Sequence, residues 1–455
     1  MKQAVQKLDM LSGPLWNKIP QFALPVAATA ILEQLFNASD IAVVGNFSGA
    51  ASTIAVAAVG ANSFVISLVV NFFIGIALGA NVVIANAIGR EDTDAVHRAV
   101  HTAVVVAVLG GALVTVLGEL AAGPALRALN VPAEVLPYAL LYLRIYLLGV
   151  PVILLYNFEA AIFRSVGDTR VPLQTLAFSG VLNVLLNLFF VIVLHMTVNG
   201  VATATVLSNA ISSVLLFVRL RRSDKAIHLE WTALRIDRRS LQKILQIGIP
   251  AGIQSAVFSI SNIVIQSAIN SLGTVVMAAS SAAFNIEVVA YDVLNSFSQA
   301  CTTFVGQNYG AGKLDRCRKT LVLCLVEDAL ASGIAILLVL GSGHFLLSLF
   351  NRDPEVIALG YTRLMTVFTA YFFSMLYEVM SGYLRGFGIS LVPALLTMLG
   401  VCGVRILWIA TAFPRSRTFQ TILLAYPLSL AATAVLILLA LLIYHPSRRT
   451  KGEAV

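Results

Sequence analysis

Twelve stretches of mostly apolar residues follow one another along the 455-residue chain, separated by short polar connectors. Each can cross a hydrocarbon layer about 30 Å thick, and within lipid the backbone is satisfied only in helices or closed barrels. Soluble domains carry roughly 25% charged residues, whereas this chain has 11% charged and 58% hydrophobic residues. The sequence therefore predicts an all-α integral membrane protein, with helices over 20–47, 52–84, 99–122, 136–163, 171–194, 200–218, 245–270, 275–306, 319–342, 356–384, 391–413 and 418–444.

The 30 lysines and arginines divide unevenly between the two sides of this predicted membrane protein. With a cytoplasmic N-terminus, 23 lie in inner segments, 4 in outer connectors, and Arg144, Arg363 and Arg405 within spans. The positive-inside rule then predicts a multi-pass protein of the cell membrane with both termini cytoplasmic. The net charge of +8 indicates contact with anionic inner-leaflet lipids, and no motif or aromatic pattern indicates a nucleic-acid partner.

The sequence matches itself at an offset of 221 residues, without gaps over four spans. The pattern R-x2-G-x3-VP occurs in both copies, at Arg164, Gly167, Val171 and Pro172 and again at Arg385, Gly388, Val392 and Pro393. Such self-similarity indicates a duplicated chain. Because each half has an even number of spans, the halves should be parallel repeats related by an axis along the membrane normal.

The duplication predicts two pseudo-symmetric six-helix bundles around a central cleft. The N-terminal lobe is expected over 1–218, a basic cytoplasmic linker over 219–243, the C-terminal lobe over 244–445, and a cytoplasmic tail over 446–455. Pro25 and Pro250 occupy corresponding places in the first span of each half. A proline within a helix frees a carbonyl and permits a bend, so both positions are candidate helix bends and the first span is a candidate moving part.

Ionisable residues within a membrane cost about 2.5–3.5 kcal/mol each and therefore need an explanation. In the first span, Glu33, Asn37 and Asp40 stand at i, i+4 and i+7, which places them on one helix face. Two acids on one stripe favour a proton carrier or an oxygen site for Na⁺. The alternative is a structural pair of acids held by Arg144. In the fifth span, Asn183 and Asn187 share a face.

A second set of polar residues lies in spans of the C-terminal half. Acids and aromatic rings in a water-filled cavity suit a lipophilic cation, although interhelical hydrogen bonding is the alternative for the uncharged members. Glu159, Glu327 and Asp328 are further intramembrane acids, to which the pattern assigns no role. The expected cavity residues are Gln254, Asn262, Glu287, Tyr291, Asp292, Asn295, Tyr377 and Glu378.

Several segments together resemble the multidrug and toxic compound extrusion (MATE) family. They are GDTRVPLQTLAFSGVLNVLLNLFF (Gly167 to Phe190), VNGVATAT (Val198 to Thr205), VGQNYGAGKLDR (Val305 to Arg316) and the run in the first span that contains Asp40. The resemblance covers essentially the whole chain, with both halves in register. It implies two six-helix lobes around a cleft, and export of organic, often cationic, compounds in exchange for Na⁺ or H⁺.

The resemblance also implies that Asp40 matches a cation-coupling acid of the N-terminal lobe. Glu33, Asn37, Asn183 and Asn187 are then its expected companions, with a transient Na⁺ near Asp40 as one form of the site. Two departures from the family pattern leave the ion open. Asn187 stands where other members often carry an acid in N-x3-D, and Gln254 and Asn262 lie in a seventh span that lacks the acid of sodium-coupled members.

Three functions are considered for a membrane protein with this sequence. The first is a secondary active exporter that works by antiport and alternating access, is driven by an ion gradient because no P-loop is present, and has no cofactor. The second is a flippase of lipid-linked saccharide precursors, which would favour a strongly cationic cavity. The third is a polytopic membrane enzyme, for which no nucleophile or metal signature is present. The expected partners are small organic substrates and membrane lipids, and a monomer is expected.

Overall fold

The computed structural model describes residues 8–49, 52–129, 131–223, 226–444 and 446. Within these residues, twelve helical spans are long and apolar enough to cross a membrane, and no β-strand occurs. The predicted all-α membrane fold is therefore confirmed, and the span ends lie within seven residues of those expected. The spans are α1 (Lys18–Phe47), α2 (Ser52–Gly89), α3 (Thr93–Ala128), α4 (Leu136–Ser165), α5 with η2 (Arg170–Val193), α6 (Val198–Arg221), α7 (Arg238–Asn270), α8 (Thr274–Gly310), α9 (Leu314–Ser348), α10 (Pro354–Gly386), α11, η4 and α12 (Leu391–Thr411) and α13 (Phe419–Tyr444).

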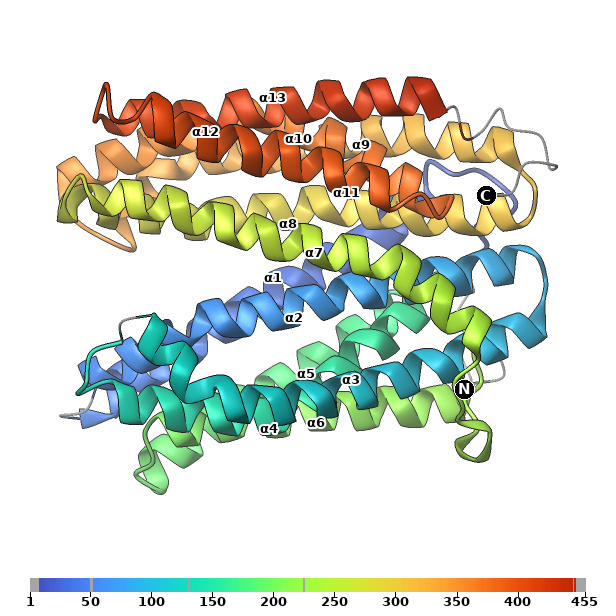
Figure 1. The fold of residues 1–455 in the computed structure, drawn as a ribbon, viewed down its shortest axis with the longest axis horizontal. Helices are drawn as coiled ribbons and strands as arrows, with labels where there is room; N and C mark the ends of the chain where they lie inside the picture. Colours follow the sequence, from blue (N-terminus) through green and yellow to red (C-terminus); the bar gives the residue numbers. More distant parts are fainter. Residues whose placement is uncertain (1–7, 50–51, 130, 224–225, 445, 447–455) are drawn as a thin grey trace. The chain divides into compact units, whose positions relative to one another are not determined.

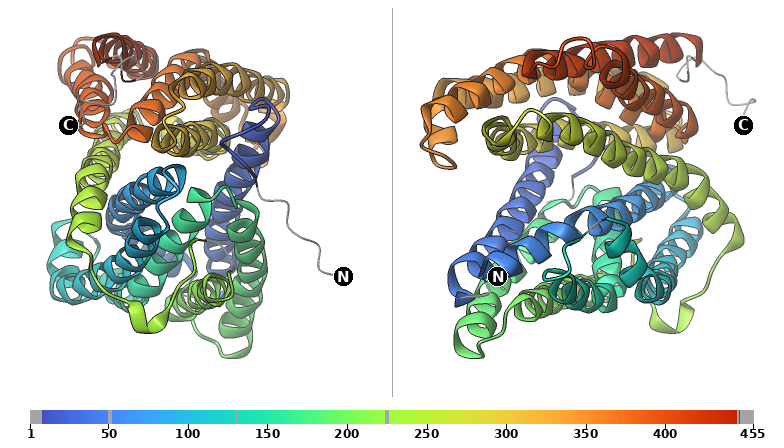
Figure 2. Two further views of the ribbon diagram at one scale, coloured as in Figure 1. Left: turned by 90° about the vertical axis from the view of Figure 1, so that its right-hand side faces the viewer. Right: turned by 60° about the vertical axis from the view of Figure 1, so that its left-hand side comes forward.

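The chain forms two compact units, each a bundle of long helices (Figures 1 and 2). The N-unit comprises Ala28–Gly248, and the C-unit comprises Leu8–Ala27 together with the residues from Ile249 onward. The sequence places the boundary between lobes in a linker, whereas the units change within α1 and α7. Pro25 and Pro250 lie inside these two helices, within three residues of the change. A bend at either proline stays a prediction.

The predicted linker belongs to the packed N-unit over its second part. Ile227 and Leu229 are fully buried in the core of that unit. The backbone N–H of Glu230 donates to Nε2 of His101 at 3.0 Å, and that of Asp237 donates to Oγ1 of Thr102 at 2.9 Å. Two side chains of α3 thus hold the segment that leads into α7.

Residues before α1 join the C-unit through backbone carbonyls. Arg316 donates to the carbonyls of Met10 and Gly13 at 3.0 and 2.9 Å, and Asn308 donates to the carbonyl of Met10 at 3.1 Å. Arg316 Nε also donates to Oδ1 of Asn308. The sequence run VGQNYGAGKLDR therefore fastens the N-terminal segment to the turn between α8 and α9.

The repeated R-x2-G motif has the same local structure in both halves. Gly167 and Gly388 both adopt left-handed backbone angles, with φ of 81° and 84°. Each N–H bonds the carbonyl three residues back, of Arg164 at 2.9 Å and of Arg385 at 2.8 Å. Glycine takes this conformation without the steric cost of a Cβ atom. The local match agrees with a duplicated chain, and the symmetry axis between the halves remains a prediction.

Candidate ion-coupling and substrate sites

The carboxylate of Asp40 lies in a buried polar cluster of the N-unit formed by α1, α5 and α6. Nδ2 of Asn187 donates to Oδ1 of Asp40 at 2.5 Å and to Oδ1 of Asn183 at 3.1 Å. Oγ1 of Thr205 donates to Oδ2 of Asp40 at 2.9 Å. Asp40 is 5% exposed, Asn183 is 4% exposed and Asn187 is fully buried. The structure thus brings together three residues that the sequence singled out, and adds Thr205.

The hydroxyl of Thr205 faces two oxygen atoms but carries only one proton. Its Oγ1 lies 2.9 Å from Oδ2 of Asp40 and 3.0 Å from the backbone carbonyl of Val201. A hydroxyl can donate one hydrogen bond and accept others. Thr205 can therefore donate to an ionised Asp40, or accept from a protonated Asp40 while it donates to Val201. Oδ1 of Asn187 is buried and has no hydrogen-bond partner among the described residues.

Glu33 and Asn37 lie on the same helix as Asp40 but are not among its hydrogen-bond partners. Both side chains are exposed within the N-unit. Arg144, the alternative partner considered for these acids, instead pairs with Glu119 at 3.5 Å. The three-residue stripe predicted from spacing therefore contains one buried acid and two exposed polar groups.

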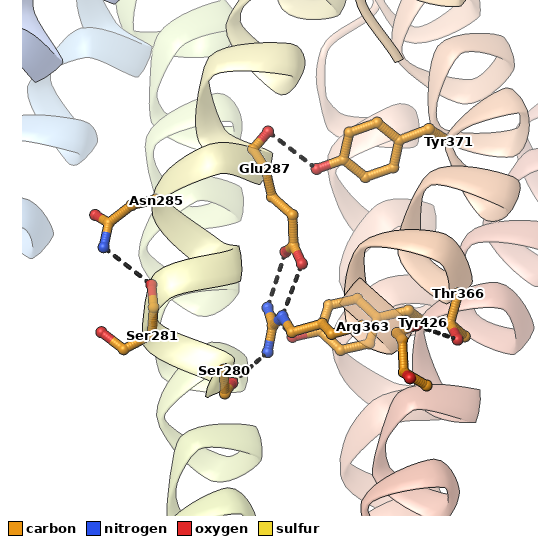
Figure 3. A network of polar contacts seen from close by, with 9 residues as sticks. Ser280, Ser281, Asn285, Glu287, Arg363, Thr366, Tyr371 and Tyr426 are labelled. Carbon is orange, nitrogen blue, oxygen red and sulfur yellow. Dashed lines mark hydrogen bonds and ion pairs between the residues drawn. The ribbon is translucent and has the colours of Figure 1, made fainter. Parts of the chain in front are cut away.

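Glu287 forms a buried ion pair with Arg363 inside the C-unit (Figure 3). Nε and Nη2 of Arg363 donate to the two carboxylate oxygens of Glu287 at 2.7 and 2.8 Å, and the residues are 2% and 3% exposed. Arg363 also donates to Ser280 and Tyr426. A two-point pair of this kind satisfies both charges. The charge of Glu287 is therefore paired within the C-unit, and its assignment to substrate binding stays a prediction.

Two arginines of the C-unit donate hydrogen bonds to side-chain oxygens of α7. Arg385 donates to Oε1 of Gln254 at 2.9 Å, and Arg405 donates to Oδ1 of Asn262 at 3.4 Å. The guanidinium of Arg405 lies 4.6 Å from the ring centre of Tyr426. Among the described residues, no carboxylate forms an ion pair with Arg405. These contacts favour the interhelical hydrogen-bond role for Gln254 and Asn262.

The remaining predicted cavity residues lie on α8 and α10. The hydroxyl of Tyr291 donates to Oε1 of Glu378 at 3.0 Å. Glu378 and Tyr377 are buried, whereas Asp292 and Asn295 are half-buried. Asp292 thus keeps a buried carboxylate oxygen, Oδ2, without a hydrogen-bond partner among the described residues.

The acids without an assigned role are also buried or half-buried. Glu159 is fully buried and accepts a bond from Ser213 at 3.1 Å, and Asp328 is fully buried and accepts one from Ser332 at 2.6 Å. Both carboxylate oxygens of Glu327 are buried without a hydrogen-bond partner among the described residues. A search of those residues finds no group of three or more His, Cys, Asp or Glu side chains that could hold a metal ion.

Sequence reasoning missed Thr205 and Arg363. Thr205 ends the VNGVATAT segment, but a threonine in a membrane helix commonly bonds its own helix, as it also does here with Val201. Arg363 gave a clearer signal, because a basic residue in a span needs a partner. Arg363 and Glu287 are far apart in sequence, so only the fold identifies them as partners.

Comparisons with known proteins agree on one family. The MatE family profile matches residues 25–189 and 250–410. The chain is 26% identical to the probable multidrug resistance protein YoeA of Bacillus subtilis, over 86% of each chain. It is also 26% identical to the probable multidrug resistance protein NorM of Thermotoga maritima, over 96% of this chain and 94% of the relative. A solved transporter of the MOP superfamily from Pyrococcus furiosus shares the fold, with a TM-score of 0.90 at 20% identity, covering 99% of this chain and 100% of that one.

Proposed function

Since this chain belongs to the MatE family of membrane transporters, we propose that it exports organic cations by antiport, with Asp40 carrying the coupling ion. The family consists of transporters, so the membrane-enzyme hypothesis is excluded. The observation that carries the proposal is the buried cluster of Asp40, Asn183, Asn187 and Thr205. One acid among neutral donors and acceptors can hold one cation.

The coupling ion that fits this cluster best is a proton. Asn187 presents its amide nitrogen, a hydrogen-bond donor, to Asp40, whereas a Na⁺ ion would require oxygen ligands on that side. Thr205 can serve both protonation states of Asp40, since it can donate to the ionised acid or accept from the protonated one. Protonation at Asp40 would then favour one conformation and deprotonation the other, which gives alternating access its driving force.

The proposal is tested in proteoliposomes that contain the purified protein and a fluorescent lipophilic cation. A pH gradient alone should drive concentrative transport of the dye. A Na⁺ gradient alone, at equal pH on both sides, should not. Transport driven only by a Na⁺ gradient would show that Na⁺, and not the proton, is the coupling ion. Transport of an anionic dye in place of the cation would overturn the proposed substrate class.

The substrate proposal rests on Asp292 and on the similarity to two probable multidrug resistance proteins, YoeA and NorM. Asp292 keeps an unpartnered carboxylate oxygen in the described structure. The flippase alternative favours a strongly cationic cavity, but in the C-unit Arg363, Arg385 and Arg405 are buried and bonded to neighbouring side chains. These contacts weigh against that alternative.

Replacing Thr205 tests the proton-carrier arrangement directly. Thr205→Val keeps the shape but removes the hydroxyl, and a lost hydrogen bond to a charged group costs about 1.5–3 kcal/mol. We expect dye efflux driven by a pH gradient to fall by about tenfold or more, while Thr205→Ser keeps near-normal efflux. Equal efflux in the valine and serine variants would show that the hydroxyl has no part in coupling.

A further inference from the structure

A basic cavity lies in the N-unit where α2 ends and where α3 and α7 begin. It has a volume of about 410 Å³ and is lined by Arg90, Arg98, Arg239 and Lys243, together with Asp92 and Asp237. Four cationic groups therefore face two acids. Among the described residues, none of the four cations forms an ion pair.

The two acids of the cavity are already occupied by helix capping. Asp92 accepts from the backbone N–H of Ala95 at the start of α3. Asp237 accepts from the backbone and the hydroxyl of Ser240 at the start of α7. These bonds, with Arg98 and Arg239 nearby, hold the pKa of Asp237 below its usual value. Both acids thus cap helix N-termini, and the four cations of the cavity outnumber its two acids, which leaves a net positive charge.

A second cavity of about 400 Å³ lies along the same side of α3 and is almost wholly apolar. Val105 and Leu109, which line it, stand seven and eleven residues after Arg98, on the same face of the helix. The distance from Arg98 to Val105 along the helix is about 10 Å. Trp231 and Leu234 line this apolar cavity, and Asp237 of the same segment lines the basic one.

We propose that these two cavities form a binding site for one anionic phospholipid. The phosphate group lies among Arg90, Arg98, Arg239 and Lys243, and an acyl chain lies along Val105, Leu109 and Trp231. A cavity of this size holds a glycerophosphate head group, and basic pockets at the cytoplasmic ends of membrane helices bind anionic head groups. The bound lipid joins α3 to the segment that leads into α7, and so stabilises the N-unit.

The test uses the purified full-length chain, stripped of lipid in a neutral detergent. Binding of phosphatidylglycerol, phosphatidylcholine and soluble glycerol phosphate is measured by native mass spectrometry and by thermal unfolding. We expect phosphatidylglycerol to bind and to raise the unfolding temperature, with phosphatidylcholine and glycerol phosphate much weaker. Each basic side chain near an anionic lipid contributes about fivefold in affinity, so Arg98→Gln with Lys243→Gln should weaken phosphatidylglycerol binding about 25-fold.

The matched control is Arg219→Gln with Arg222→Gln, which removes the same charge from exposed residues outside the cavity. This control should bind phosphatidylglycerol as the wild type does. An equal loss in the control would show non-specific attraction and overturn the site. Glycerol phosphate binding as tightly as the lipid would show a site for soluble anions only. The single variant Lys243→Gln changes an exposed side chain and should weaken lipid binding about fivefold if the double variant fails to fold.

Discussion

Arg363→Gln is expected to destabilise the protein strongly and to lower the yield of folded protein, because it leaves the carboxylate of Glu287 buried without its counter-charge. Glu287 is 3% exposed and Arg363 donates to both of its oxygens. Breaking a buried pair by removing one partner costs about 3–5 kcal/mol, out of a total of about 5–15 kcal/mol for many proteins. The measurement is thermal unfolding of detergent-purified protein, with yield of the monodisperse peak as a second readout.

Two further variants make this prediction specific. Removing both charges with Glu287→Gln and Arg363→Met should recover much of the lost stability, since no buried charge then remains. Arg352→Gln removes a basic residue from the exposed connector before α10 and should leave the unfolding temperature unchanged. An Arg363→Gln protein that unfolds at the wild-type temperature would contradict a structural role for the pair.

Asp40→Asn is expected to stop gradient-driven efflux while the protein still folds and binds its substrate. Asparagine keeps the size of the side chain and most of its hydrogen bonds to Asn187 and Thr205, but it cannot take up or release a proton. Ion and substrate binding are coupled by about 1–3 kcal/mol in typical cases, or 5–150-fold in affinity. We expect dye efflux against a gradient to fall to background, measured in proteoliposomes with an imposed pH gradient.

Asp94→Asn is the control, since it removes an exposed acid from the N-unit outside the Asp40 cluster. It should transport at close to the wild-type rate. If Glu33→Gln stops efflux and Asp40→Asn does not, the coupling role belongs to Glu33.

The helices and the duplication could be predicted from the sequence because both leave local signals. The length of an apolar stretch identifies a membrane-spanning helix, and the 221-residue offset identifies equivalent positions such as Gly167 and Gly388. Unit membership could not be predicted. Residues 8–27 join the C-unit through contacts such as that of Arg316 with the Met10 carbonyl, and a bond to a backbone carbonyl leaves no trace in the sequence.

The candidate sites were predictable only in part. Helical spacing placed Asn183 and Asn187 on one face, and family resemblance linked them to Asp40, as the structure also does. Spacing on one helix cannot reveal a partner on another. Glu287 therefore looked like a free acid, although Arg363 neutralises it.

The central claim is that Asp40 releases a proton when substrate binds, and calorimetry of the purified protein tests it most directly. A transported cation is titrated into wild type and Asp40→Asn in buffers of different ionisation enthalpy, so that the number of protons released per bound cation is obtained. Antiport requires ion and substrate to weaken each other's binding. The wild type should release protons and bind the cation more weakly as pH falls, whereas Asp40→Asn should release none and bind independently of pH. Equal proton release from both proteins would contradict the assignment of coupling to Asp40.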